Sequence, residues 1–451
     1  MNDDKTLYVL NASQDVVNLQ TKYSLFRRVA NILFSITFDE PLDRALMKKA
    51  IDLLIERNDC LRITFVKKGK TLMQRFESER HLGAIPEKDF RTPAKMEAFM
   101  LAFRKKEVSV LKGRSLEVVF AKNPDRKDTV IFKISHFVAD TYGISTLVTD
   151  LMGIYNALRD GQPLPAAPGP FEAVIAKDQD YRNDTEAFKK DREFFEEFYT
   201  RRHPDHPSYC GIHGNGSDRW LKYKAKGMFS LPYLFIKCDT EGYRFVLDKP
   251  FVDVVLKWCE SNGFTPSAFF FYTYAIAASL LNDRAKYQIP LELINNRGTL
   301  AERKAAGTKV QALGLYTVVD YEKSFMENIE LFANDQNELY RHTKMTYLEI
   351  EEIEHKFWNY SMLSQMTNFS FSFIPFKSPE GISLQIHSNG KGALVAYIAM
   401  MLDVRTGEIS VNYDIQTKMI SPQQLVEYQN LCLQVITRVI SSPDKKLSEI
   451  L

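Results

Sequence analysis

The chain has few cysteines, almost no net charge and no long apolar run, and each shortage excludes a class of protein. Five cysteines are scattered through 451 residues, odd in number and without a Cys-x-x-Cys pair. We therefore expect neither a disulfide framework nor a metal site, and the pattern favours a reducing cytoplasm. The formal net charge is only +2, so no overall basic field indicates nucleic acid or a membrane surface. The acidic N-terminus has no basic-then-apolar signal segment.

The most apolar stretch is FTPSAFFFYTYAIAASLL, residues 264–281. It is short for a membrane span and contains proline, serine and threonine. Thr265 followed by Pro266 is the pattern of a helix N-cap with proline at the first helical position. We predict a buried core helix here and no membrane span.

The composition that remains is that of a large globular protein. Hydrophobic residues make up 45% and charged residues 26%, with 31 Phe and 21 Tyr. A chain of this length favours two lobes, and four prolines in QPLPAAPGP mark the clearest boundary. We predict an N-terminal lobe at 1–170, a linker helix and loop at 171–225, and a C-terminal lobe at 226–451. Each lobe is expected to be mixed α/β (α+β), with helices on an antiparallel-rich sheet.

One stretch, KISHFVADTYG at residues 133–143, carries the candidate chemistry. The alternating TVIFKIS indicates a strand that ends just before His136, and an amphipathic helix begins around Gly143. A histidine at such a junction has a fixed backbone and can accept a proton at neutral pH. Asp140 either orients it or stabilises the bend. Taken alone, H-x-x-x-D favours a plainer interpretation, a buried histidine beside a helix-capping aspartate.

The wider context resembles the core motif of condensation domains of nonribosomal peptide synthetases. These belong to the HxxxD acyltransferase superfamily, together with chloramphenicol acetyltransferase. SHFVADTYGISTLVTDLMGIYNALRDGQPLP is similar to the family's HHxxxDG and its following helix. Three further segments resemble the family in the same order: IERNDCLRITF at 55–65, the Asn296-Arg297 dipeptide, and residues 412–443.

The resemblance implies a fold of two chloramphenicol acetyltransferase-like lobes, a V-shaped pseudo-dimer with His136 in a tunnel between them. His136 would be the general base, and Asp140 would be structural, in an ion pair for which Arg62 and Arg297 are the candidates. No permanently bound cofactor is implied. The donor would be a thioester on the phosphopantetheine of a carrier protein in trans, or on CoA. The acceptor would be a small amine or alcohol, and a monomer suffices.

Two positions depart from the family pattern. Ser135 stands where the family has its first histidine, and Thr141 replaces the glycine after the aspartate. Glycine permits a positive φ that threonine does not adopt cheaply. We therefore expect that a backbone N–H directed at the oxyanion is displaced, with Gly143 a candidate to restore the turn.

Two further features are weaker candidates. In TNFSFSF, residues 367–373, polar residues alternate with phenylalanines. Ser370 is therefore a candidate to bind a tetrahedral intermediate, and a half-exposed strand with a wet face explains the pattern equally well. The alternating lysines at 222, 224 and 226 fit docking of an acidic carrier protein. A charged edge strand that discourages aggregation is the favoured explanation of that row.

Three functions stay open at this point. The first is amide formation by a free-standing condensation-type enzyme, because we find no adenylation or carrier segment in the chain. The second is ester formation by an O-acyltransferase that uses acyl-CoA or a carrier thioester. The third is a degenerate member that binds carrier proteins without catalysis. The departures from the family pattern at Ser135 and Thr141 would indicate that loss of activity.

Overall fold

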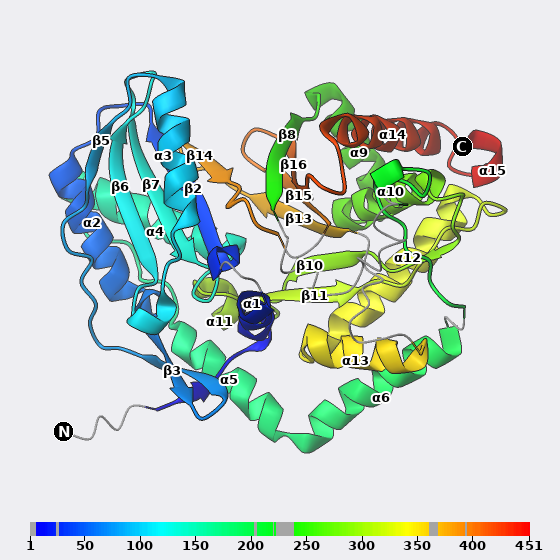
Figure 1. Ribbon diagram of the computed structural model, residues 1–451, viewed down its shortest axis with the longest axis horizontal. Coiled ribbons are helices and arrows are strands. Elements are labelled where there is room, and N and C mark those ends of the chain that lie inside the picture. Colours follow the sequence, from blue (N-terminus) through cyan, green and yellow to red (C-terminus); the bar gives the residue numbers. More distant parts are fainter. Residues whose placement is uncertain are drawn as a thin grey trace. The chain divides into compact units, whose positions relative to one another are not determined.

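The computed structural model describes residues 6–23, 27–202, 205–219, 221, 239–359, 369–392 and 395–451. The chain forms two compact units. Unit 1 comprises 1–188, 295–310 and 377–389, and unit 2 comprises 189–294, 311–376 and 390–451. Each unit combines a sheet with helices (Figure 1). The predicted lysine row at 222–226 lies outside the described residues.

Unit 1 is built on a five-stranded sheet in the order β14-β2-β7-β6-β5, beside a smaller sheet in the order β1-β4-β3. Side chains alternate along β2 and β7, so Phe34, Ile36 and Phe132 lie in one core cluster with α2 and α4. The other face of the sheet carries a smaller apolar cluster that packs against α3. The elements are β1 (Tyr8–Val9), α1 (Ala12–Tyr23), β2 (Asn31–Phe38), α2 (Arg44–Arg57), β3 (Ile63–Lys68), β4 (Thr71–Phe76), β5 (Glu87–Asp89), α3 (Pro93–Lys105), β6 (Leu116–Lys122), β7 (Asp128–Ser135), α4 (Thr141–Arg159), α5 (Phe171–Asn183), α11 (Leu300–Lys304) and β14 (Ile382–His387).

The boundaries of the units differ from those predicted from the sequence. The sequence pattern places all of 226–451 in one lobe, yet 295–310 and 377–389 belong to unit 1. Strand β14 pairs antiparallel with β2, from Ile382 opposite Phe38 to His387 opposite Leu33. Periodicity predicts that a strand forms but not which sheet edge supplies its hydrogen-bond partners.

Unit 2 contains a mixed six-stranded sheet in the order β11-β10-β13-β15-β16-β8 and a two-stranded sheet of β12 and β9. Strands β15 and β16 pair antiparallel as a hairpin. The elements are α6 (Thr185–Arg202), β8 (Thr240–Val246), α9 (Lys249–Asn262), α10 (Pro266–Leu281), β9 (Tyr287–Gln288), β10 (Leu291–Asn295), β11 (Val310–Gly314), β12 (Thr317–Val318), α12 (Phe325–Leu339), α13 (Tyr347–Phe357), β13 (Ser370–Phe376), β15 (Ala396–Asp403), β16 (Glu408–Gln416), α14 (Pro422–Ser441) and α15 (Leu447–Ile450).

Helix α10 is the predicted apolar core helix. Its N-cap is Thr265, whose side chain accepts a hydrogen bond from the backbone N–H of Ala268, and Pro266 follows as the first helical residue. All residues from Ala268 to Ser279 are buried. No single helix within the described residues is long and apolar enough to cross a membrane; α9 and α10 reach that length only as a pair bent by 110°.

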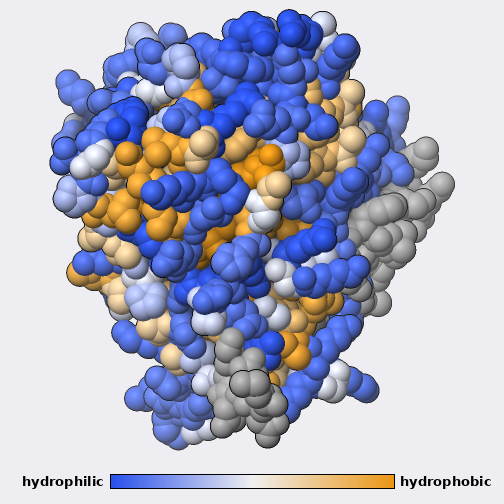
Figure 2. Space-filling model, turned by 90° about the vertical axis from the view of Figure 1, so that its left-hand side faces the viewer, coloured by the Kyte–Doolittle hydropathy of each residue, from blue (hydrophilic) through white to orange (hydrophobic). Residues whose placement is uncertain are grey.

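Some apolar side chains of unit 1 stay at the surface. Figure 2 shows apolar side chains gathered among hydrophilic ones on the face that lies at the left of Figure 1. The exposed large apolar residues of unit 1 are Leu101, Leu111, Leu164, Leu300 and Ile386. Single exposed residues of this kind are ordinary, so only their surroundings can give them a role.

Candidate active site

The turn that carries His136 is fixed by its backbone. Strand β7 ends at Ser135, and α4 begins at Thr141, as the sequence predicted. The N–H of Ser135 donates to the carbonyl of Ser115 at 3.0 Å, and the N–H of His136 donates to the carbonyl of Ala30 at 2.6 Å. The chain segments leading into β6 and β2 therefore hold this turn from two sides. A histidine presented in this way keeps its position while it reacts.

The His136 side chain is set up as a neutral base. It is half-buried, and its Nδ1 is buried without a hydrogen-bond partner among the described residues. Burial lowers the pKa of His136 below 6.5, and the polar interaction with its own backbone and then the charge of Asp140 oppose that effect only in part. The imidazole is therefore neutral at pH 7 and can accept a proton. A buried polar atom with no partner is uncommon in proteins, and a catalytic role is one explanation of it.

Asp140 faces a cation and not the histidine. Its carboxylate accepts from Arg297 twice, Nη1 to Oδ2 at 2.9 Å and Nη2 to Oδ1 at 3.1 Å. The N–H of Gly143 donates to Oδ1 and the N–H of Lys309 to Oδ2, each at 2.7 Å. Burial raises the pKa of Asp140, but the Arg297 charge and these hydrogen bonds outweigh it, so the pKa lies below 3.8. The aspartate thus caps α4 and stays ionised.

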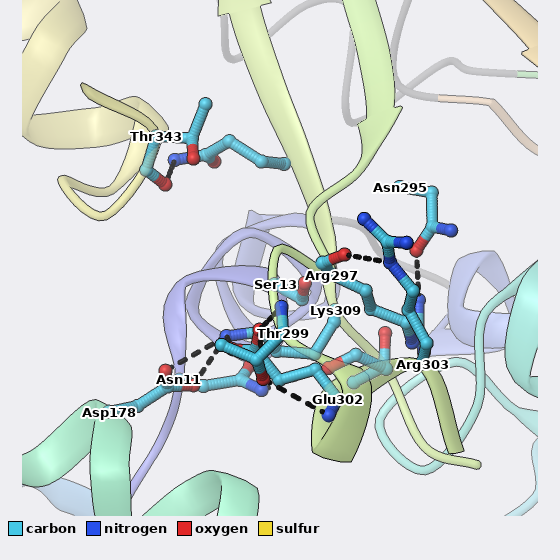
Figure 3. Close-up of polar contacts among 12 residues, drawn as sticks. Asn11, Ser13, Asp178, Asn295, Arg297, Thr299, Glu302, Arg303, Lys309 and Thr343 are labelled. Atoms are coloured by element: carbon cyan, nitrogen blue, oxygen red, sulfur yellow. Dashed lines mark hydrogen bonds and ion pairs between the residues drawn. The ribbon is translucent and has the colours of Figure 1, made fainter. Parts of the chain in front are cut away.

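Arg297 is held through both of its Nη atoms, whereas its Nε is buried without a hydrogen-bond partner among the described residues. Its Nη1 also donates to Asn295 Oδ1 at 2.6 Å, and its Nη2 donates to the carbonyl of Gly307 at 2.8 Å. The guanidinium lies over the ring of Tyr142, 4.7 Å from the ring centre. Figure 3 shows Asn295 and Arg297 in this arrangement. The side chain of Arg297 is only 1% exposed, so the ion pair with Asp140 is a buried structural pair.

The rest of the segment 295–310 is tied down by Lys309 and by the start of α1. Lys309 Nζ contacts Asp178 Oδ1 at 2.8 Å and Glu302 Oε1 at 3.2 Å (Figure 3). Asn11 Nδ2 donates to the carbonyl of Thr308 at 2.8 Å. These contacts fix the segment that supplies Arg297 to Asp140.

Gly143 is required by close packing and not by a positive φ. A Cβ atom on Gly143 would lie 2.3 Å from the carbonyl oxygen of Gly307. Gly307 itself has a φ of +113°, and a Cβ there would meet the ring of Phe171 at 2.4 Å. Because the N–H of Gly143 donates to Asp140, it is not available to an oxyanion. The prediction that Gly143 restores an oxyanion turn is therefore wrong.

The two departures from the family pattern cause less disturbance than expected. Thr141 is the first residue of α4, and it is not among the non-glycine residues with positive φ in the described chain, so the expected strain does not arise. Ser135 is 1% exposed, and its Oγ accepts from the N–H of Phe137 at 3.4 Å. Ser135 therefore stabilises the turn locally and is not placed to bind substrate.

Two other candidates are engaged elsewhere. Arg62 donates from Nε to the carbonyl of Glu77 at 2.9 Å and from Nη1 to the carbonyls of Ile55 and Glu56. It satisfies carbonyls at the end of α2, which lack partners within the helix, so including Arg62 in the ion pair was wrong. Ser370 in unit 2 is 1% exposed and donates to the carbonyl of Ala396 at 3.3 Å. Its hydroxyl therefore makes a hydrogen bond within the sheet, to strand β15.

The sequence interpretation missed Gln14, which supports the histidine turn. Gln14 Nε2 donates to the carbonyl of Phe137 at 3.0 Å, directly after His136. Asn11 and Gln14 also cap α1 reciprocally: the Asn11 N–H donates to Gln14 Oε1 at 3.0 Å, and the Gln14 N–H donates to Asn11 Oδ1 at 2.9 Å. An N-x-x-Q pattern before a helix predicts the cap from sequence alone. The hydrogen bond from Gln14 to Phe137 could not be predicted, because the two residues are far apart in the chain.

Residues 5–207 match the family of the Condensation domain. One curated relative, a plipastatin synthase protein of Bacillus subtilis (strain 168), is 19% identical over 325 residues. The match covers 70% of this chain but only 12% of that protein, so the chain spans a small part of its relative.

Solved structures match over nearly the whole chain. The first condensation domain of the calcium-dependent antibiotic synthetase, in complex with a substrate analogue, has a TM-score of 0.79 at 14% identity, with 99% of each chain covered. The starter condensation domain of rhizomide synthetase, in complex with C8-CoA, has a TM-score of 0.80 at 15% identity and covers 99% of this chain and 98% of that one. SgcC5 of Streptomyces globisporus has a TM-score of 0.75 at 13% identity, and the match covers 97% of this chain and 100% of that one. The predicted mixed α/β condensation-domain fold is confirmed.

Proposed function

We propose that this chain, a condensation-domain protein by its fold and by the match of residues 5–207, is an acyltransferase that forms amides. It would move an acyl or aminoacyl group from a phosphopantetheine thioester to an amine. The observation that carries this proposal is His136, a neutral imidazole on a fixed turn with an unpartnered Nδ1. The donor is a substrate in this scheme and not a resident group.

The proposed step is simple in its atoms. The amine nitrogen attacks the thioester carbonyl, and a C–N bond forms while His136 accepts the proton from nitrogen. The tetrahedral intermediate then collapses, the C–S bond breaks, and the thiolate leaves and takes up the proton. General-base help of this kind contributes about 10²–10⁴ in rate. Asp140 and Arg297 act through position only, because their charges satisfy each other.

One feature of the comparisons supports a thioester donor. The rhizomide synthetase domain was solved with C8-CoA, which is an acyl thioester. A carrier-bound or CoA thioester is therefore the donor class that we propose for this chain.

Ester formation is the second candidate, and a specific observation favours it. SgcC5 was solved with (R)-(-)-1-(2-naphthyl)-1,2-ethanediol, which has two hydroxyl groups and no amine. In this version His136 takes the proton of an alcohol, and the donor chemistry is unchanged. The unstrained backbone at Thr141 argues against the third function, a carrier-binding protein without catalysis.

The experiment combines two donors with two acceptor classes. The purified chain is incubated with octanoyl-CoA or with an octanoyl-loaded carrier protein, each with a panel of amines and a panel of alcohols, and products are identified by mass spectrometry. Amides that disappear in His136→Ala support the proposal, and esters that disappear favour the second candidate. Full turnover in His136→Ala refutes the role of the histidine. No product from any pair refutes both transferase proposals.

A further inference from the structure

We propose that residues 105–114, here called the basic segment, dock an acidic carrier protein that delivers the acyl thioester to His136. This inference rests on the proposed function and names the partner of that site. The sequence interpretation considered carrier docking at the lysines of 222–226, a different part of the chain.

The basic segment concentrates unpaired positive charge. Lys105, Lys106, Lys112 and Arg114 are exposed, and Glu107 is the one acidic residue among them. Within the described part of the chain, no ion pair or side-chain hydrogen bond involves these four cations. The whole chain carries a net charge of only +2, so this concentration is local. A positive patch of this kind attracts an acidic surface and raises its rate of association.

The segment is held in place from inside the protein. Asn31 Nδ2 donates to the carbonyl of Lys106 at 2.8 Å, and the N–H of Val108 donates to Asn31 Oδ1 at 3.1 Å. The N–H of Gly113 donates to the carbonyl of Val110 at 3.1 Å and closes a short turn. The cations therefore project from an ordered scaffold and not from a free loop.

The same contacts place the segment beside the catalytic turn. Asn31 is the strand partner of Ser135, the residue before His136. Immediately after the segment, the carbonyl of Ser115 accepts from the N–H of Ser135 at 3.0 Å. Both ends of the basic segment are thus fixed to the end of β7 that presents the histidine. A carrier bound here would bring its flexible phosphopantetheine arm to the edge of the sheet where His136 lies.

Two exposed leucines complete the surface. Leu101 is 37% exposed and lies one helical turn before Lys105, so the two side chains share a face of α3. Leu111 is 38% exposed and directly precedes Lys112. Exposed apolar side chains next to charged ones are typical of protein interfaces, whereas binding of a nucleic acid backbone depends mainly on cations. An acidic protein is the occupant that fits both features.

The test measures carrier binding without turnover. The probe is an acidic acyl carrier protein with a fluorophore and an octanoyl-phosphopantetheine arm, titrated by anisotropy at low and high salt. The docking variant combines Lys105→Glu, Lys106→Glu and Lys112→Glu. The matched control reverses three other exposed lysines of unit 1, at 67 and 68 at the end of β3 and at 70 in the turn to β4. Both variants change the net charge equally, so only the position of the charges differs.

We expect wild-type binding that weakens with salt, and a dissociation constant raised about tenfold or more in the docking variant but less than about threefold in the control. Equal affinity of the docking variant and wild type, equal losses in both variants, or no wild-type binding overturns the inference. Transfer from octanoyl-N-acetylcysteamine, which lacks a carrier, stays at the wild-type rate in the docking variant. Binding without any transfer refutes the proposed function alone.

Discussion

The buried pair of Arg297 and Asp140 allows the sharpest test of the site's architecture. Replacing Arg297 with methionine keeps much of the side-chain volume and removes the charge. Asp140 then retains two backbone N–H donors, from Gly143 and Lys309, but faces no cation. The variant therefore leaves a carboxylate that is 6% exposed without its counter-ion. Removal of one partner costs more than removal of both, because the survivor stays buried and charged.

The magnitude follows from the geometry. Two unit charges about 4 Å apart attract by about 4 kcal/mol at an effective dielectric constant of about 20. Loss of one partner of a buried ion pair costs about 3–5 kcal/mol by comparison with other proteins. We therefore expect Arg297→Met to destabilise unit 1 by about 4 kcal/mol. The double variant with Asp140→Asn should recover part of that loss, because asparagine still caps a helix and carries no charge.

The assay must report on unit 1 by itself. The tryptophans among the described residues, Trp258 and Trp358, both fall within unit 2, so their fluorescence serves as an internal control. Hydrogen exchange of α4 peptides, followed by mass spectrometry, reports on the capped helix. A loss of about 4 kcal/mol speeds exchange through global opening by about a thousandfold, at about 1.4 kcal/mol for each factor of ten. Exchange within about threefold of wild type would refute the reasoning, since the pair would then contribute under about 1 kcal/mol.

Three further predictions follow from single side chains. Because burial holds the pKa of His136 below 6.5, transferase activity should fall only below that pH. His136→Ala should lower turnover by a factor of about 10²–10⁴ and leave the melting temperature unchanged. Gly143→Ala should destabilise unit 1 by about 1–3 kcal/mol in the exchange assay, because its Cβ meets the Gly307 carbonyl; wild-type exchange would contradict this. Glu354, whose pKa burial raises to about 8, accepts from the Tyr199 hydroxyl at 2.5 Å. Its folded pKa exceeds its unfolded value, so its contribution is complete at low pH and is lost as pH rises toward 8, by about 1.4 kcal/mol per pH unit. Glu354→Gln should abolish that loss in urea unfolding followed by tryptophan fluorescence, and an unchanged pH dependence would contradict the assignment.

Local patterns in the sequence were sufficient for the elements that carry the site. The alternation before His136 and the amphipathic pattern after Asp140 predicted the strand, the turn and the helix that the structure contains. Thr265 and Pro266 likewise predicted the start of α10. These features depend on residues a few positions apart, where periodicity and capping rules apply directly. The family resemblance, carried by motifs in order, predicted the fold.

Contacts between distant residues were decided only by the tertiary structure. Asp140 and Arg297 are 157 positions apart, and nothing in their spacing distinguishes Arg297 from Arg62, whose charge is used at the end of α2. The need for glycine at 143 depends on the Gly307 backbone packing against it. Strand β14 likewise found its partner in β2, in the other half of the chain. Sequence patterns predict which face or helix end a residue occupies. The tertiary fold determines which charge, carbonyl or strand lies opposite it, because that depends on how segments far apart in the chain pack together.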